Sequence, residues 1–131
     1  MTPLRFRAWQ HEFKKMYEVW QVYIGQQGGF MGRAKDGEVR QQVGLADTFV
    51  LMQYTGLTDK NGVEIFEGDV VVFEAKRYEP FRVEYSQFYA GFIGLNQFNN
   101  QSPELAKWCR CKDIEVIGNI YQNPDLLPSN A

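Results

Sequence analysis

Side chains at 4–9 alternate with a period of two, a polar patch follows at 10–15, and 16–24 is an apolar, β-prone run. A period of two is typical of strands with one buried face, so we expect an N-terminal β-hairpin with His11 near its tip. Residues 12–22 also carry apolar side chains at helical spacing. Their cluster of Val, Trp, Tyr and Ile nevertheless favours strands.

The alternation fades in the next segment, Gly25–Gly44, which holds several glycines and few apolar residues before Val39 and Val43. Such a composition predicts a long loop or flap, with room for a short strand pair. The segment also marks the expected boundary between the hairpin and the main body.

Strand-like runs separated by turn residues dominate the rest of the chain. Asn61 and Gly62 tolerate the positive φ of a tight turn, and Ser102–Trp108 begins with a serine cap and a proline, as a short helix does. The expected strands are 48–55, 64–66, 70–74, 81–85, 90–95 and 114–121. The pattern predicts a mainly β fold, with a small antiparallel barrel-like body, SH3-like or related, and one short helix.

The expected organisation has three parts within one compact unit. Residues 1–44 form the hairpin and glycine-rich loop, 45–127 form the barrel-like body, and 128–131 form a tail. A chain of 131 residues is long enough to build this core without disulfides or a structural metal.

Composition says more about where the protein is located than about what it does. The net charge of −2 argues against a strong basic field, and no apolar run is long enough for a membrane span. Cys109 and Cys111 lie too close for an unstrained disulfide, which favours a reducing, cytoplasmic location. Aromatic residues make up 15% of the chain, which predicts a β-rich core and a homo-oligomer or partner interface.

No group of residues predicts catalysis. His11 is the one histidine, so it has no second imidazole with which to build a triad or zinc site. Asp59 and Asp69 lie in turns, where their carboxylates are expected to accept backbone hydrogen bonds. We therefore expect no enzyme, no metal and no cofactor.

The one candidate surface is basic and aromatic. Cations that follow phosphates and aromatic rings that stack on bases are the means by which small barrels bind single-stranded nucleic acid. A solvated charged edge over an aromatic core is the simpler interpretation. The residues are Lys76, Arg77, Tyr78, Arg82, Lys107, Trp108, Arg110 and Lys112.

Three blocks of the sequence resemble a known family. Leu51–Val72 is similar to the signature of the YopX family, proteins of temperate bacteriophages and prophages. Phe6–Trp9, followed by Lys15–Tyr17, resembles the family's opening pattern, and Glu115–Leu127 resembles its closing pattern. Gln10 departs from the pattern, since an acid is common at that place.

The resemblance implies a compact β-rich fold and a phage or prophage origin, and it brings no catalytic residues with it. In the Leu51–Val72 block we expect Gly56, Gly62 and Gly68 at sharp chain reversals. The leading hypothesis is a non-enzymatic phage accessory protein that self-associates or binds a host or phage protein. The alternative is a nucleic-acid-binding phage regulator that uses the basic and aromatic residues.

Overall fold

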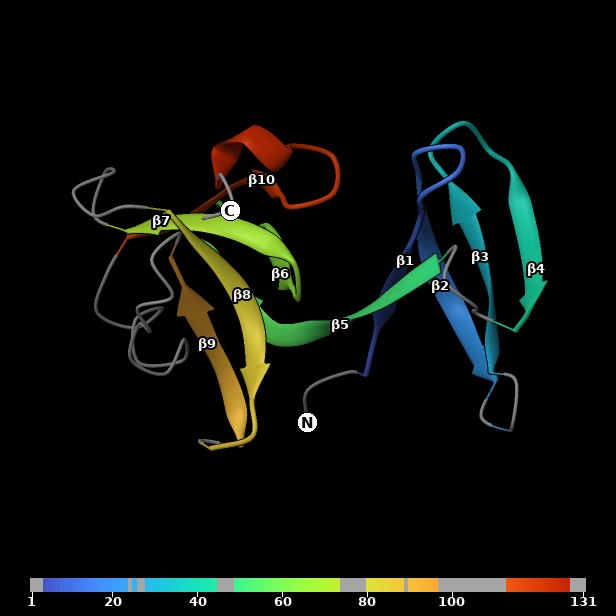
Figure 1. Cartoon of the computed structure of the whole chain (residues 1–131), viewed down its shortest axis with the longest axis horizontal. Helices are drawn as coiled ribbons and strands as arrows, with labels where there is room; N and C mark the ends of the chain where they lie inside the picture. The colour runs from blue at the N-terminus through green and yellow to red at the C-terminus, as the bar shows by residue number, and fades with distance from the viewer. Residues whose placement is uncertain are drawn as a thin grey trace. The chain divides into compact units, whose positions relative to one another are not determined.

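The computed structural model describes residues 4–23, 25, 28–44, 49–73, 80–88, 90–96 and 113–127. In these residues the chain is mainly β, and its strands pair antiparallel, as predicted (Figure 1). The contacts divide it into two compact units, Met1–Tyr54 and Thr55–Ala131. This division falls inside a strand. The expected domain boundary after Gly44 stays a prediction.

The first unit is one antiparallel sheet whose strands follow the order β4-β3-β2-β1-β5. The predicted hairpin is confirmed: β1 pairs with β2, and Ala8 lies opposite Tyr17. On its other side β1 pairs with the first half of β5, where Ala8 lies opposite Leu51. The strands are β1 (Phe6–Gln10), β2 (Lys15–Tyr23), β3 (Gly29–Ala34), β4 (Val39–Val43) and β5 (Phe49–Thr58).

The expected loop at Gly25–Gly44 is therefore mostly a second hairpin. Strands β3 and β4 pair in continuous register from Gly29 opposite Val43 to Arg33 opposite Val39. The alternation is hard to detect in the sequence because the inward side chains of β4 are polar rather than apolar. The short strand pair that the sequence allowed is β3 and β4, and it accounts for most of the described part of Gly25–Gly44.

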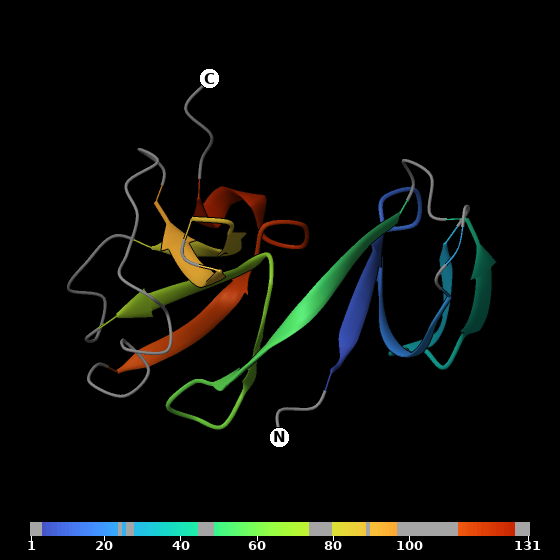
Figure 2. The ribbon, with the colours of Figure 1, turned by 90° about the horizontal axis from the view of Figure 1, so that it is seen from below.

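The sheet of the first unit curls around an aromatic core. In a flat sheet, Phe30 on β3 and Phe49 on β5 would be about 14 Å apart, because two strands lie between them. Their ring centroids are only 5.4 Å apart, and Tyr17 lies 5.8 Å from Phe30. A register shift between Val19 and Gln21 accompanies the strong curvature of β2 in Figure 2.

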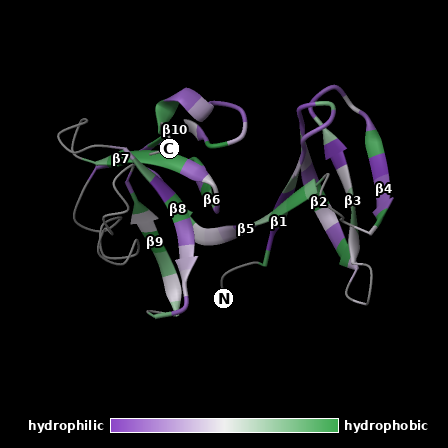
Figure 3. Ribbon diagram, in the orientation of Figure 1, coloured by the Kyte–Doolittle hydropathy of each residue, from purple (hydrophilic) through white to green (hydrophobic). Residues whose placement is uncertain are grey.

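The second unit contains a four-stranded sheet in the order β10-β7-β8-β9, and β6 lies beside β5. The predicted central strand is confirmed, since β7 lies between two neighbours and is buried throughout. It is continuously hydrophobic after Asp69, whereas β4 of the first unit is largely hydrophilic (Figure 3). The elements are β6 (Glu64–Phe66), β7 (Asp69–Phe73), β8 (Phe81–Ser86), β9 (Gly91–Leu95), β10 (Ile114–Asn119) and the 3-10 turn η2 (Pro124–Leu126).

Aspartates organise the turns of the second unit, as expected. Asp59 accepts backbone hydrogen bonds from Asn61 at 2.8 Å and from Val63 at 2.9 Å, and the intervening Gly62 has a φ of +81°. Asp69 accepts one from Phe66 at 2.8 Å. One expectation was wrong: Gly56, with a φ of +88°, lies inside β5 and not at a chain reversal.

Two further sequence expectations lie outside what the structure describes. The predicted helix Ser102–Trp108 and the two cysteines fall in 97–112. No helix in the described part of the chain is long and apolar enough to cross a membrane.

Candidate functional site

The predicted basic and aromatic surface is represented by a single described residue, Arg82. It lies on β8, half-buried, and its Nε donates a 2.7 Å hydrogen bond to Glu84 Oε1. Its charge is therefore offset by a carboxylate on the same face of the strand, which weakens it as a phosphate contact. The others lie outside the described residues, so nucleic-acid contact stays a prediction: Lys76, Arg77, Tyr78, Lys107, Trp108, Arg110 and Lys112.

The described residues bring no catalytic or metal-binding group together. His11 is exposed in the turn between β1 and β2. Asp59 and Asp69 use their oxygens on backbone N–H groups. Within the described ranges, no three His, Cys, Asp or Glu side chains are grouped closely enough to hold a metal ion.

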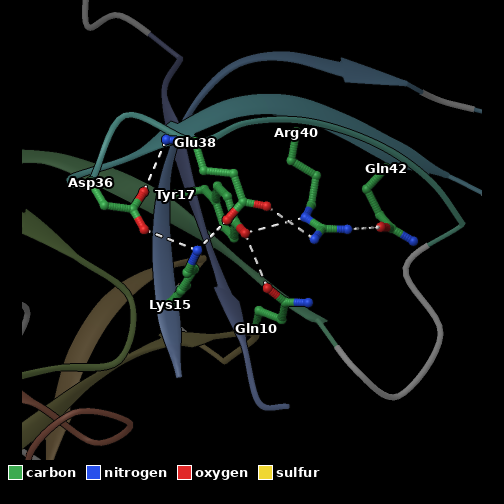
Figure 4. A network of polar contacts seen from close by, with 7 residues as sticks. All are labelled: Gln10, Lys15, Tyr17, Asp36, Glu38, Arg40 and Gln42. Carbon is green, nitrogen blue, oxygen red and sulfur yellow. Dashed lines mark hydrogen bonds and ion pairs between the residues drawn. The ribbon is translucent and has the colours of Figure 1, made fainter. Parts of the chain in front are cut away.

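A network of polar side chains lies in the first unit and joins β2 to β4 and the turn before it (Figure 4). Lys15 Nζ forms ion pairs with Glu38 and, at 2.9 Å, with Asp36 Oδ2. Asp36 also accepts the backbone N–H of Glu38 at 2.9 Å through Oδ1. The lysine at the start of β2 is thereby joined to the turn that precedes β4.

The second half of this network is built on the buried Tyr17. Its hydroxyl donates to Gln10 Oε1 at 3.1 Å and accepts from Arg40 Nε at 3.2 Å. Arg40 also donates to Glu38 at 3.2 Å and to Gln42 at 3.4 Å. Its guanidinium lies 5.8 Å from the ring centroids of both Tyr17 and Phe49, close enough for a cation–π contact.

The electrostatics keep every ionised member of the network charged. Hydrogen bonds to Glu38 and then Asp36 raise the pKa of Lys15 above its ordinary value. The backbone N–H of Glu38, followed by Lys15, lowers the pKa of Asp36, and Lys15 lowers the pKa of Glu38. The Tyr17 hydroxyl is the main cause of the raised pKa of Arg40. Because each shift favours the charged form, these groups do not change protonation state near neutral pH. The network is therefore suited to holding strands together.

The network uses only every second residue of β4. Arg40 and Gln42 take part in it, as does Glu38 just before the strand, whereas Val39 and Val43 point away and are 51% and 64% exposed. Gln41, also exposed, donates to the Tyr23 hydroxyl at 3.3 Å. One side of the strand is thus fixed, and the other presents two valines.

The backbone of β4 has the same two-residue pattern. Ala34 N–H donates to Glu38 O, and Gly44 N–H donates to Gly28 O, both at 2.9 Å. Since hydrogen-bonded pairs recur at every second residue of an antiparallel ladder, Val39, Gln41 and Val43 direct their N–H and C=O groups away from β3. Among the described strands, none pairs with β4 on that side. We call this row, Val39, Gln41 and Val43, the β4 edge.

The four-stranded sheet of the second unit has the outer strands β10 and β9, and β10 is covered on its outer side. The backbone N–H of Lys60 donates to Ile114 O at 2.8 Å, and Val116 N–H donates to Asp59 Oδ2 at 3.0 Å. The turn after β5 therefore occupies groups of β10 that point away from β7. Natural sheets commonly block their edges in this way, or with Pro, Lys or a bulge, and β4 has none of these three. The protections it does have are its length of five residues and the inward-pointing charge of Arg40.

The sequence contained a weak signal for the β4 edge. Val39 and Val43 are the apolar residues at the end of a glycine-rich segment, and their spacing of four allows both to lie on one face of a strand. The polar residues between them concealed the strand. Their partners, Lys15 and Tyr17, are remote in sequence, so the network could not be inferred from local pattern.

Fold and site together define a mainly β protein of two antiparallel units, with an open strand edge on the first. A family model described as "YopX protein" matches residues 5–128, nearly the whole chain. The chain belongs to the YopX family, as its three sequence blocks predicted.

A solved structure supports the fold. The chain is similar to the protein in "Crystal structure of protein EF1440 from Enterococcus faecalis", with a TM-score of 0.67 and 30% sequence identity. The similarity covers 97% of this chain and 99% of that one. No curated protein matches this chain significantly.

Proposed function

We propose that this chain is a non-enzymatic accessory protein of a phage or prophage, working in the host cytoplasm as a self-associating binding module. The observation that carries the proposal is the β4 edge, an outer strand with exposed valines and outward-facing backbone groups. Such an edge is a template for pairing with another strand.

The network behind the strand supports this role. An extended segment binds more tightly when it is ordered beforehand, because less conformational entropy is lost on association. Arg40 and Glu38 hold the inner side of β4 through contacts with Tyr17 and Lys15. The outer side is therefore presented in strand conformation, and of its backbone groups the Val43 carbonyl accepts a bond of 3.4 Å from Gln42 Nε2 of the same strand.

The test is the molar mass in solution. We expect sedimentation equilibrium and light scattering to show a reversible oligomer at tens of micromolar, with dissociation on dilution. A chain that stays monomeric at that concentration would contradict the proposal. In cells that express a tagged and an untagged copy, the tagged copy should recover the untagged one.

A further inference from the structure

We infer that the partner of the β4 edge is a second copy of the same strand, paired antiparallel about a two-fold axis at Gln41. The inference rests on the proposed self-association and adds its surface, its direction and its register. It commits the edge to this chain and not to a foreign peptide.

The backbone fixes the allowed registers. In an antiparallel pair, residues that direct their N–H and C=O groups toward the partner lie opposite one another. Val39, Gln41 and Val43 are the residues of β4 that direct them outward, by the pattern of its bonds to β3. A second copy must therefore place its own odd-numbered residues opposite these three.

The side chains select one register among those allowed. With the axis at Gln41, Val39 lies opposite Val43 of the second copy, and Gln41 lies opposite itself. A shift of two residues in either direction would place Gln41 opposite a valine and carry the other valine past the end of β4. Cross-strand apolar pairs stabilise a sheet, so the central register is favoured.

Charge is also compatible with a second copy of this strand. In the central register Arg40 lies opposite Gln42 of the second copy, so no like charges face each other. Gln42 already accepts a hydrogen bond from Arg40 within its own strand, at 3.4 Å. Val39-Arg40-Gln41-Gln42-Val43 is symmetric in polarity about Gln41, which an edge selected for a foreign peptide has no need to be.

Charge substitutions at the two valines test direction and register. In V39K/V43E, an antiparallel two-fold pair places the introduced lysine opposite the introduced glutamate at both ends. We expect this variant to dimerise, with an affinity that falls as salt is added. In V39E/V43E, like charges meet at both ends, and we expect dimerisation to weaken about tenfold or more.

Two further variants separate the edge from general surface effects. Val63 of the second unit is 48% exposed, close to the exposure of Val39, so V63E is a matched control that should self-associate like the wild-type chain. Q41P removes one outward N–H without removing a bond to β3, and it should abolish dimerisation while circular dichroism stays that of the folded chain.

The outcomes distinguish the inference from the function on which it rests. A wild-type chain that is monomeric at tens of micromolar would overturn both. Wild-type self-association that persists unchanged in V39E/V43E and Q41P would overturn the β4 pairing alone. Dimerisation of V39E/V43E together with loss of dimerisation in V39K/V43E would contradict the antiparallel register. Binding of a foreign extended peptide to the β4 edge, in place of a second copy, would also overturn the inference.

Discussion

The outer strands β4 and β10 differ in what contacts the backbone groups on their outer side. Both end a sheet, and both have backbone groups that point away from their one neighbour among the described strands. In β10, the turn that contains Asp59 and Lys60 takes up such groups. In β4, side chains hold the strand from its inner face. The outward-directed N–H and C=O groups have no partner strand among the described strands.

The difference separates two uses of polar residues. Asp59 is almost fully buried, and its carboxylate accepts the backbone N–H groups of Asn61, Val63 and Val116. Around Tyr17 the polar residues order a strand whose remaining side is exposed. A covered edge contributes to stability alone, whereas an ordered open edge is available for binding.

The largest expected effect is at the covered edge. D59N keeps the size of the side chain but turns an N–H toward the N–H of Val116, which then has no acceptor there. We expect the free energy of unfolding to fall by about 3 kcal/mol, since hydrogen bonds to a buried charged group are lost. Urea denaturation measures the loss. Asn61 is exposed and uses only its backbone N–H with Asp59, so N61A should change stability by less than about 0.5 kcal/mol.

Lowering the pH should reduce the difference in stability between the wild-type chain and D59N. Burial raises the pKa of the Asp59 carboxyl, but the N–H groups of Val116, Val63 and Asn61 outweigh burial and lower it overall. A lowered pKa in the folded state means a contribution that is present above the ordinary aspartate pKa of about 3.9 and lost as pH falls through the folded value. The unfolding free energy of the wild-type chain should therefore fall below about pH 4 more steeply than that of D59N. Equal slopes would contradict this role for Asp59.

A smaller effect is expected behind the open edge. Y17F removes the hydroxyl that joins Gln10 to Arg40 while keeping the ring in the core. We expect a loss of about 1–2 kcal/mol in thermal or chemical unfolding, because both partners lose a bond. Y23F removes a hydroxyl that accepts only an exposed, 3.3 Å bond from Gln41, and it should cost less than about 0.5 kcal/mol. A Y17F variant as stable as Y23F would show that the network does not hold β4.

The smallest effect is expected from the exposed ion pairs of Lys15, since solvent screens them. The pKa of Lys15 is raised in the folded chain, so its contribution is fully present below the ordinary lysine value of about 10.4 and lost as pH rises through the folded value. The melting temperature should fall above about pH 10, and less so in K15M. A fall of the same size in K15M would assign it to other groups, such as the tyrosines.

The fold was predictable where its causes are local. The apolar run of β7, the turn at Asp59–Gly62 and the closing strand β10 are each specified by adjacent residues. The first half of β5 pairs with β1 in the first unit, which no local pattern shows. Likewise, the open edge depends on Arg40 meeting Tyr17 across the curled sheet, a contact between residues 23 positions apart.

The basic and aromatic surface stays a prediction, whereas the β4 edge was not predicted from the sequence. The chemistry of basic and aromatic residues is visible in the sequence, and of the eight residues of that surface the structure describes Arg82, which is paired with Glu84. The β4 edge consists of two valines, a glutamine and their backbone. Its relevance comes from its position at the end of a sheet, which composition does not encode.

The most direct measurement is amide hydrogen exchange along β4 at two protein concentrations. In the dilute monomer, the amides of Arg40 and Gln42 should be protected by their bonds to β3, and those of Val39, Gln41 and Val43 should exchange freely. At a concentration where the chain self-associates, the same three amides should become protected. Exchange at Val39, Gln41 and Val43 that does not change with concentration, in a chain that does self-associate, would contradict pairing through the β4 edge.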